Sequence, residues 1–329
     1  MRIALLHNVR PAELEQGVPD DTFEEFDGEE TLHAIAEALG GLGASVVPVE
    51  ANRDLPARLL RGHYDLAFNI AEGQGRRCRE AIPAAICELL ELPYTGSDPL
   101  TLAATLDKDV AHRLVRPIVP VPEGVVVRNR ADEALLERLR YPVLVKPNDE
   151  GSSKGIRGNP VAHDVSGAID RCRWLLTTYG CPARVETFLP GVEVTVGVIE
   201  DERGPRVLGL MEIAPSDEQP LDGWVYSLEV KRDWRARVRY HVPPRLPAAT
   251  LARLEHLALE AWRLLACRDV SRFDFRMDAH GEPHFIECNP LPGLNPVSGD
   301  IVLLSRPTLP YAELVQSIAK SAMRRNGLV

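Results

Sequence analysis

The sequence predicts a mixed α/β protein of three regions, in which an N-terminal parallel-sheet α/β domain precedes two α+β regions. Over the first 91 residues, short apolar runs alternate with helical patterns, which is the rhythm of a parallel sheet covered by helices. Later strand-like runs end in a hairpin pattern near the C-terminus. The 329 residues, 45% hydrophobic and 26% charged, suffice for two or three domains with sizeable cores.

The first region, which we place at residues 1–98, begins with an apolar strand over residues 2–9. A helix is predicted from Thr31, because Leu32, Ile35, Ala36 and Leu39 share one face and glycines follow. Strands over 45–49 and 64–70 and a helix over 79–91 complete the pattern. The turn cluster PYTGSDP at 93–99 marks a plausible boundary.

The second region, residues 99–184, contains a predicted helix over 101–115 that ends before Pro117. Strands follow at 124–128 and 141–146, with a charged helix over 131–140 between them. A polar, glycine-bearing loop and a helix over about 164–179 close the region.

The third region, residues 185–329, opens with strands over 192–200 and 207–213. A charged loop over 215–235 and a helix over 247–266 follow. Two strands, 271–278 and 283–289, are joined by the turn HGEP and form a predicted hairpin.

Composition excludes several classes of protein. No apolar run reaches the ~20 residues of a membrane span, and the N-terminus resembles a first strand rather than a signal peptide. Six cysteines form no CxxC pair, which favours reduced thiols in a cytoplasmic protein. A net charge of −10 argues against nucleic-acid binding. The acidic run over residues 20–30 is expected to be a solvated loop.

A lysine and a glycine-bearing loop form the first candidate binding feature. Lys146 ends an apolar strand, and Gly151, Ser152, Ser153 and Gly155 follow it. Backbone N–H groups and hydroxyls of such a loop can hold phosphate oxygens, and the lysine adds a positive charge. A plain hairpin loop explains this stretch alone equally well, and it matches neither common nucleotide fingerprint.

Glu186 and Glu193, on either side of a proline–glycine turn, form a second candidate binding feature. The backbone of residues 186–189 could pair with the edge of a flat heterocycle, while Glu193 accepts hydrogen bonds from ribose hydroxyls. Taken alone, an ordinary turn with exposed acids is the better interpretation.

The C-terminal hairpin predicts a metal site. Asp274 lies on one strand, and Glu287 and Asn289 lie two residues apart on the next, so the three should share a face. Carboxylate and amide oxygens are the ligands that Mg²⁺ prefers. We expect Phe273, Phe275, Phe285 and Cys288 in the core behind them, and Arg272 beside Asp274 as a basic partner.

In order and spacing, these segments resemble the ATP-grasp superfamily, and within it the D-alanine–D-alanine ligase-like enzymes. The similarity runs from about residue 64 to residue 300 and includes LPYTGSDPLTLAATLDK, YPVLVKPNDEGSSKGI, VETFLPGVEVTVGVI, VYSLEVK and RFDFRMD…FIECNPLPGLNPVS. The resemblance implies an ATP-grasp fold, in which the two α+β subdomains clamp ATP between them.

The resemblance also implies roles for individual residues. ATP would be bound by Lys108, Lys146, Lys231, Ser152, Ser153, Glu186, Leu189 and Glu193, and two Mg²⁺ ions, for which Mn²⁺ may substitute, by Asp274, Glu287 and Asn289. Arg272, Ser152, Lys231 and Gly293 would be the catalytic residues. Gly293 and Ser298 would contact the carboxylate of the second substrate.

The activity implied is ATP-dependent joining of two amino acids through an acyl phosphate, with small-molecule substrates, no nucleic acid or membrane partner, and a possible homodimer. The family's N-terminal Ser-Ala-Glu stretch is missing, and Glu24, Glu25 or Glu29 are candidates to replace its acid. Glu72 and Arg79 stand where the family has a His-Gly stretch, and Arg232 replaces a tyrosine. A ligase for a different amino acid or small carboxylate, and a nucleotide-binding regulator without catalysis, are the alternatives.

Overall fold

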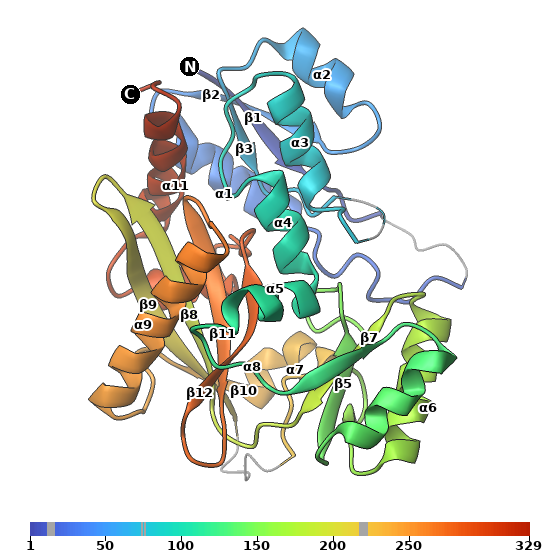
Figure 1. Cartoon of the computed structure of the whole chain (residues 1–329). Helices are drawn as coiled ribbons and strands as arrows, with labels where there is room; N and C mark the ends of the chain where they lie inside the picture. Colours follow the sequence, from blue (N-terminus) through green and yellow to red (C-terminus); the bar gives the residue numbers. More distant parts are fainter. Residues whose placement is uncertain (12–16, 74, 76, 217–222) are drawn as a thin grey trace.

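A computed structural model describes residues 1–11, 17–73, 75, 77–216 and 223–329. The described strands form three separate sheets, each covered by helices (Figure 1). The fold is thus the predicted one, a parallel-sheet domain followed by two α+β parts with antiparallel sheets. The predicted domain limits at residues 98 and 184 stay a prediction.

The N-terminal sheet has the order β2–β1–β3, with all strands parallel. Its strands are β1 (Arg2–His7), β2 (Ser45–Glu50) and β3 (Leu66–Asn69). The strands alternate with α1 (Glu29–Gly40), α2 (Leu55–Gly62) and α3 (Ala81–Leu89). β1 is buried because helices cover both faces, which explains its continuous apolar run. The short helix α2 was not predicted.

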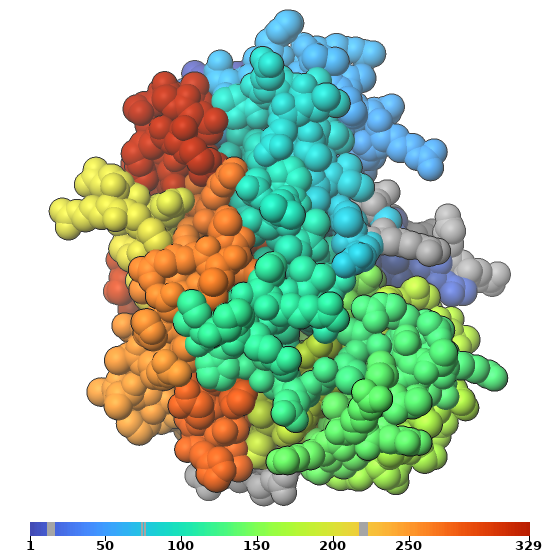
Figure 2. Space-filling model, in the orientation of Figure 1, coloured from blue at the N-terminus to red at the C-terminus, as the bar shows by residue number. Residues whose placement is uncertain are grey.

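The single helix predicted over 101–115 is wrong, because the chain forms two helices, α4 (Pro99–Leu106) and α5 (Lys108–Val115). Asp107 adopts an extended conformation between them and its carboxylate accepts a hydrogen bond from the backbone N–H of Val110. This is N-capping, which a short acidic side chain does well. The break makes Lys108 the first residue of α5. In Figure 2 these helices lie between the green central part and the orange C-terminal part.

The central sheet has the order β4–β7–β5–β6 and is antiparallel. Its strands are β4 (Gly124–Val127), β5 (Val143–Pro147), β6 (Val161–Ala162) and β7 (Ala183–Thr187). Helix α6 (Val165–Thr178) packs on it, and its N-terminus is capped by Asp164. The predicted charged helix is a 3₁₀ helix, Arg130–Arg138.

The largest sheet has the antiparallel order β10–β9–β8–β11–β12. Its strands are β8 (Glu193–Asp201), β9 (Gly204–Pro215), β10 (Val238–His241), β11 (Val270–Met277) and β12 (Pro283–Asn289). Helix α9 (Ala248–Leu264) covers one face. The predicted loop 215–235 in fact contains α7 (Leu228–Arg232) and the start of α8 (Trp234–Arg237), while residues 217–222 lie outside the described part.

A β-bulge in β12 lets the predicted hairpin bury Phe285 and still present its polar residues. Asp274 pairs with Glu287 and Phe275 with Phe285, so Ile286 is the extra residue. Strict alternation would place Phe285 and Glu287 on the same face, but the bulge reverses the side chains beyond it. Phe285 is therefore fully buried, as expected, while Ile286 and Glu287 face a cavity.

The last two helices, α10 (Asp300–Ser305) and α11 (Tyr311–Arg325), were not predicted. Helix α11 returns to the N-terminal part, where it packs against α1, and the chain ends lie near each other (Figure 1). Of the helices in the described ranges, none has the length and apolarity that crossing a membrane requires. All six cysteines are free thiols, and only Cys78 is exposed.

Candidate active site

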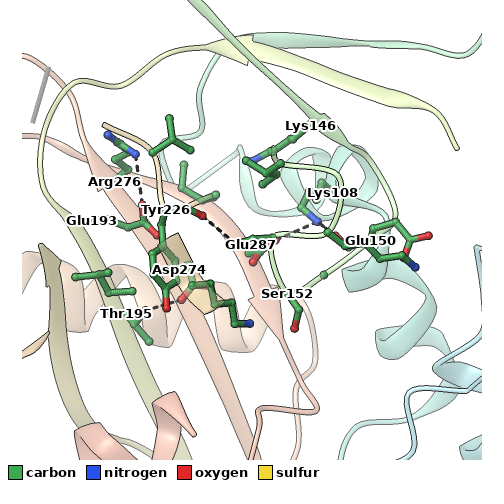
Figure 3. Close-up of a pocket in the computed structure, with 18 of the residues that line it drawn as sticks. Lys108, Lys146, Glu150, Ser152, Glu193, Thr195, Tyr226, Asp274, Arg276 and Glu287 are labelled. Atoms are coloured by element: carbon green, nitrogen blue, oxygen red, sulfur yellow. Dashed lines mark hydrogen bonds and ion pairs between the residues drawn. The ribbon is translucent and has the colours of Figure 1, made fainter. Parts of the chain in front are cut away.

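Two adjoining cavities, each of about 100 Å³, lie where the three parts meet. The first is lined by the central sheet, the loop after β5 and the largest sheet, and Figure 3 shows it. The second is bounded by the N-terminal part and the segment after β12. Six residues line both cavities: Lys108, Glu150, Gly151, Ser152, Arg272 and Glu287.

Lys108 stands at the junction of the cavities because the Asp107 break starts α5 there. Its Nζ lies 3.0 Å from a carboxylate oxygen of Glu287 and also donates to the backbone carbonyl of Glu150. Burial opposes the charge of the ammonium, but the Glu287 carboxylate outweighs it and raises the pKa of Lys108. The lysine therefore stays cationic and is placed to meet an anion.

Lys146 projects into the first cavity from β5, and its ammonium is held by a buried acid. Its Nζ lies 2.6 Å from Glu186, whose other oxygen accepts from Arg184 at 3.1 Å. Burial opposes ionisation of Glu186, yet the two cations lower its pKa to about 2. Figure 3 shows Lys146 and Lys108 facing the acidic strand residues across the cavity.

The loop over residues 150–156 covers the first cavity. Ser152 and Ser153 adopt left-handed backbone conformations, with φ of 50° and 57°, which non-glycine residues rarely do. Such strain persists where surrounding contacts fix it, often at ligand clamps. Here the Ser153 hydroxyl donates to the carbonyl of Tyr226 at 2.9 Å, which links the loop to the segment before Lys231.

The acidic side of the first cavity belongs to the largest sheet. Asp274 accepts hydrogen bonds from Thr195 at 2.8 Å, from the Arg272 guanidinium at 2.8 Å and from Asn289 at 3.2 Å. The same guanidinium bonds to Asp300 at 2.6 Å. Burial raises the pKa of Asp274, whereas Lys108, Lys146 and Arg272 overcome burial and lower that of Glu287 to about 2.

These residues fit a hard divalent cation. Asp274 and Glu287 are paired across β11 and β12, and Asn289 follows on the same face, so carboxylate oxygens and an amide meet at one place. Although Arg272 pairs with Asp274, burial and the neighbouring Glu287 still raise the pKa of Asp274, and a bound cation would counteract that rise. The predicted arrangement of oxygen ligands is therefore assembled, with Arg272 beside it.

Glu193 begins β8 at the far side of the first cavity. Its carboxylate lies 3.4 Å from Arg276, which also donates to the carbonyl of Trp224 at 2.6 Å and stacks on Phe188. Burial raises the pKa of Glu193 to about 7 despite Arg276. This carboxylate is therefore placed to accept hydrogen bonds from hydroxyl groups of a ligand.

The second cavity is strongly acidic away from the junction. Four carboxylates line it without lining the first cavity: Glu25, Asp27, Glu72 and Glu80. Burial raises the pKa of Asp27 to about 6 and that of Glu80 to about 8, and that of Glu72 well above its ordinary value. Of the three candidates for the N-terminal acid, Glu25 lines this cavity, and so does Glu72, which stands where the family has a His-Gly stretch.

The expectation that residues 20–30 form a solvated loop is wrong. Asp21 is fully buried and accepts hydrogen bonds from the N–H of Gly155 at 3.1 Å and from Tyr179 at 2.9 Å. Glu25 accepts from the N–H of Gly151 at 2.8 Å. The acidic run is ordered because it supplies acceptors to the loop over the first cavity.

Arg232, which follows Lys231, joins the same acidic run to α7. It pairs with Asp20 at 2.6 Å and with Glu24 at 2.7 Å. An arginine at this position thus connects to the N-terminal acids through ion pairs.

Most of the predicted site residues come together. The first cavity is lined by Lys108, Lys146, Ser152, Ser153, Glu193, Lys231, Arg272, Asp274 and Glu287. Asn289 and Gly293 line the second. Glu186, Leu189 and Ser298 line neither cavity. Glu186 and Leu189 are buried, and the Ser298 hydroxyl donates to the side-chain oxygen of Asn295 at 3.0 Å.

The structure adds residues that the sequence patterns did not single out. They include Glu150, Thr195, Tyr226 and Asp300 in the first cavity, and Asp27 and Glu80 in the second. Thr195 shares a sheet face with predicted residues, so strand alternation could have found it, and Arg276, whose place in the sequence suggested a basic partner for the acids, pairs with Glu193. Asp300 and Glu80 reach the site only through the tertiary fold.

Comparison with known proteins gives consistent similarities. Residues 116–320 match the family model described as the D-ala D-ala ligase C-terminus. The chain is 33% identical over 293 residues to the D-alanine–D-alanine ligase of Geobacter sulfurreducens, covering 88% of this chain and 87% of that protein. It is 31% identical over 304 residues to the ligase of Moorella thermoacetica, covering 88% and 92%.

Solved structures share the fold over the whole chain. The D-alanine–D-alanine ligase of Bacillus anthracis, complexed with ATP, has a TM-score of 0.73 at 18% identity, covering 100% of this chain and 99% of that one. The VanG D-Ala:D-Ser ligase of Enterococcus faecalis has a TM-score of 0.71 at 19% identity, covering 98% and 99%.

Proposed function

The chain belongs to the D-alanine–D-alanine ligase family of ATP-grasp enzymes, and from this premise we propose that it joins two amino acids at the expense of ATP. The observation that carries the proposal is the placement of Lys108 and Arg272 where the two cavities meet. ATP and Mg²⁺ would occupy the first cavity, and the amino acids the second.

In the first step, a carboxylate oxygen of the first amino acid attacks the γ-phosphorus of ATP, and ADP leaves. Lys108, Lys146 and Lys231 line the first cavity and would neutralise the charge that gathers on the phosphoryl oxygens. Asp274, Glu287 and Asn289 would hold magnesium, which supplies further neutralisation and orients the phosphates. Glu186 acts on Lys146 rather than on the nucleotide, because its carboxylate is bonded to that ammonium.

In the second step, the amine of the second amino acid, after losing a proton, attacks the acyl phosphate carbon, and inorganic phosphate leaves. Negative charge develops on the acyl oxygen in the transition state. Arg272 and the backbone N–H of Gly293 both line the second cavity and would stabilise it. Arg272 is fixed by Asp274 and Asp300, so it needs little reorganisation.

Water must be kept from the acyl phosphate, because hydrolysis would waste ATP. The loop over residues 150–156 would serve as the lid, with Ser152 facing both cavities and Ser153 bonded to Tyr226. A homodimer and a cytoplasmic location stay predictions from the sequence.

A ligase for another amino acid pair is the second candidate, and the four carboxylates of the second cavity favour it. The regulator without catalysis is disfavoured, because every charged residue expected for phosphoryl transfer lines the first cavity.

One experiment separates these functions. Purified protein with ATP and Mg²⁺ is supplied with pairs from a panel of D- and L-amino acids, and ADP release and product mass are measured. We expect ADP release to depend on an added amino acid and to yield a dipeptide. A rate that no amino acid raises above the substrate-free rate would contradict the ligase proposal.

A further inference from the structure

We propose that the carboxyl donor of this ligase is a small diamino acid, whose second amine is bound by Glu72 and Glu80. The inference rests on the proposed ligase function and names the substrate class of the second cavity. A single α-ammonium requires one carboxylate, and this cavity offers more than one without an ion-pair partner among the described residues.

Glu80 is the carboxylate that most directly indicates a cationic ligand. It lies at the start of α3, is only 7% exposed and lines the second cavity. Within the described ranges, no hydrogen bond or ion pair reaches its side chain. A buried acid without a partner is costly, so a carboxylate that faces a cavity points to a cation from outside the chain.

Glu25, by contrast, is already engaged. One oxygen accepts from the N–H of Gly151 at 2.8 Å, and the other pairs with Arg79 at 2.8 Å. The nearest carboxylate oxygens of Glu25, Glu72 and Glu80 lie within 4.8 Å of one another. Arg79 therefore pairs directly with Glu25, whereas Glu72 and Glu80 have no ion-pair partner within the described ranges.

The junction with the first cavity carries two cations beside two carboxylates, Glu150 and Glu287. Lys108 and Arg272 line the junction with the first cavity, where the carboxylate to be phosphorylated must lie. The cations of this cavity thus include two at the junction, while away from the junction its lining carries the four carboxylates Glu25, Asp27, Glu72 and Glu80. Ile70, Leu106 and Leu291 line it as well and limit the ligand to a short side chain.

The protonation of the acids agrees with this geometry. Burial, with repulsion from Glu25 and Glu150, raises the pKa of Glu80 to about 8, and burial with repulsion from Glu80 and Glu25 raises that of Glu72. Binding of a second ammonium would let both acids ionise and would release protons. A divalent metal at the same place is less suited, because Arg79 and Gly151 already occupy the oxygens of Glu25.

The test traps the acyl phosphate of the first substrate with hydroxylamine, which replaces the second substrate and identifies the carboxyl donor. Each of alanine, serine, 2,3-diaminopropionate and 2,4-diaminobutyrate, in both chiral forms, is supplied with ATP and Mg²⁺, and hydroxamate is measured. We expect a diamino acid to exceed alanine at least tenfold in kcat/KM.

Glu80→Gln removes the charge at nearly constant shape. The ratio of kcat/KM for the diamino acid to that for alanine should fall at least tenfold, because a merely structural defect would lower both alike. Glu37→Gln, at an exposed position of α1, is the matched control and should leave the ratio unchanged. Circular dichroism confirms that both variants fold.

Each other outcome would overturn the inference. If alanine or serine matches the diamino acids, or if Glu80→Gln leaves the ratio unchanged, the diamino-acid assignment fails and the ligase proposal stands. If Mg²⁺ alone raises the melting temperature of the wild type but not of Glu80→Gln, the acids bind metal instead. If no amino acid gives hydroxamate or ADP, the ligase proposal fails too.

Discussion

At the residue scale, the buried carboxylates of the site divide by the cations that face them. Glu186 and Glu287 contact lysine ammonium groups, and the pKa of each is lowered to about 2. Glu193 and Glu80 lack such a close lysine, and burial raises their pKa to about 7 and about 8. Glu186 and Glu287 thus keep Lys146 and Lys108 charged and in place. Glu193 and Glu80 have no such lysine partner and are placed to bind a ligand.

Glu287→Gln should lower the rate of ADP release at least about 100-fold, because it removes an expected metal ligand and the partner of Lys108. The secondary structure, measured by circular dichroism, should not change. Glu282→Gln in the same hairpin is the control, since its ion pair with Arg253 is exposed and remote from the cavities. An unchanged rate in Glu287→Gln would show that the metal lies elsewhere.

Glu186→Gln should lower the free energy of unfolding by roughly 3 kcal/mol, because it leaves the Lys146 ammonium buried without its partner. Since the folded pKa of Glu186 is about 2, its stabilisation is complete above the ordinary value and is lost as the pH falls from about 4.5 to about 2. Urea titrations at pH 7 and pH 3 measure both effects.

The exposed pair of Glu133 with Arg173 provides the comparison. Glu133→Gln should leave the urea midpoint unchanged at either pH. An equal loss of stability in the two variants, or a Glu186→Gln defect that is as large at pH 3 as at pH 7, would argue against this account.

At the element scale, interruptions of regular structure place the reactive groups. The Asp107 break between α4 and α5 brings Lys108 to the cavity junction, and the bulge at Ile286 turns Glu287 outward while Phe285 stays in the core. The left-handed serines of the lid loop are a third interruption. Each departs from an ideal helix, strand or loop at the point where a ligand would bind.

The acidic run should control this lid. Asp21→Asn weakens charge-assisted hydrogen bonds to Gly155 and Tyr179, each worth about 1.5–3 kcal/mol, so the KM for ATP should rise at least about tenfold. Limited trypsin digestion should cut faster at Lys154 and Arg157. Arg232→Ala removes a half-exposed ion pair and should have a smaller effect on both measures. Equal KM values in wild type and Asp21→Asn would exclude a role for the acidic run in closing the lid.

At the scale of the whole molecule, the two cavities exist only because three sheets and the acidic run meet. The core reinforces this arrangement, since α11 packs on α1 although almost the whole chain separates them. The pKa of Glu186 is lowered and that of Glu80 is raised, so the stability of the fold should decrease both in strongly acidic and in alkaline solution.

The thermal stability of the apoprotein should therefore have a maximum in mildly acidic solution. Below about pH 4.5 the stabilisation from Glu186 is lost, as argued above. Glu80 acts oppositely, because its raised pKa means that the folded state binds an extra proton between about pH 4.5 and about pH 8, so stability falls as pH rises through that window. Glu80→Gln should raise the melting temperature at pH 8 but not at pH 4.5.

Melting curves of both proteins across this pH range test the prediction. The groups that act on the Glu80 charge besides burial are Arg79, Glu25, Lys108 and Glu150, and all are retained in the variant. A melting temperature lower than that of the wild type at pH 8 would contradict the account.

The sequence by itself determined the alternation of strands and helices, the lysine before the lid loop, and the shared face of Asp274, Glu287 and Asn289. These features depend on neighbours in the chain or across one hairpin, where periodicity and spacing suffice. The tertiary structure decided the burial of Asp21, the pairing of Glu186 with Lys146, and the acidic cavity around Glu80. Those features depend on contacts between distant segments. The fold decides which cations lie near a carboxylate and how far it is shielded from water, and these two factors set its charge.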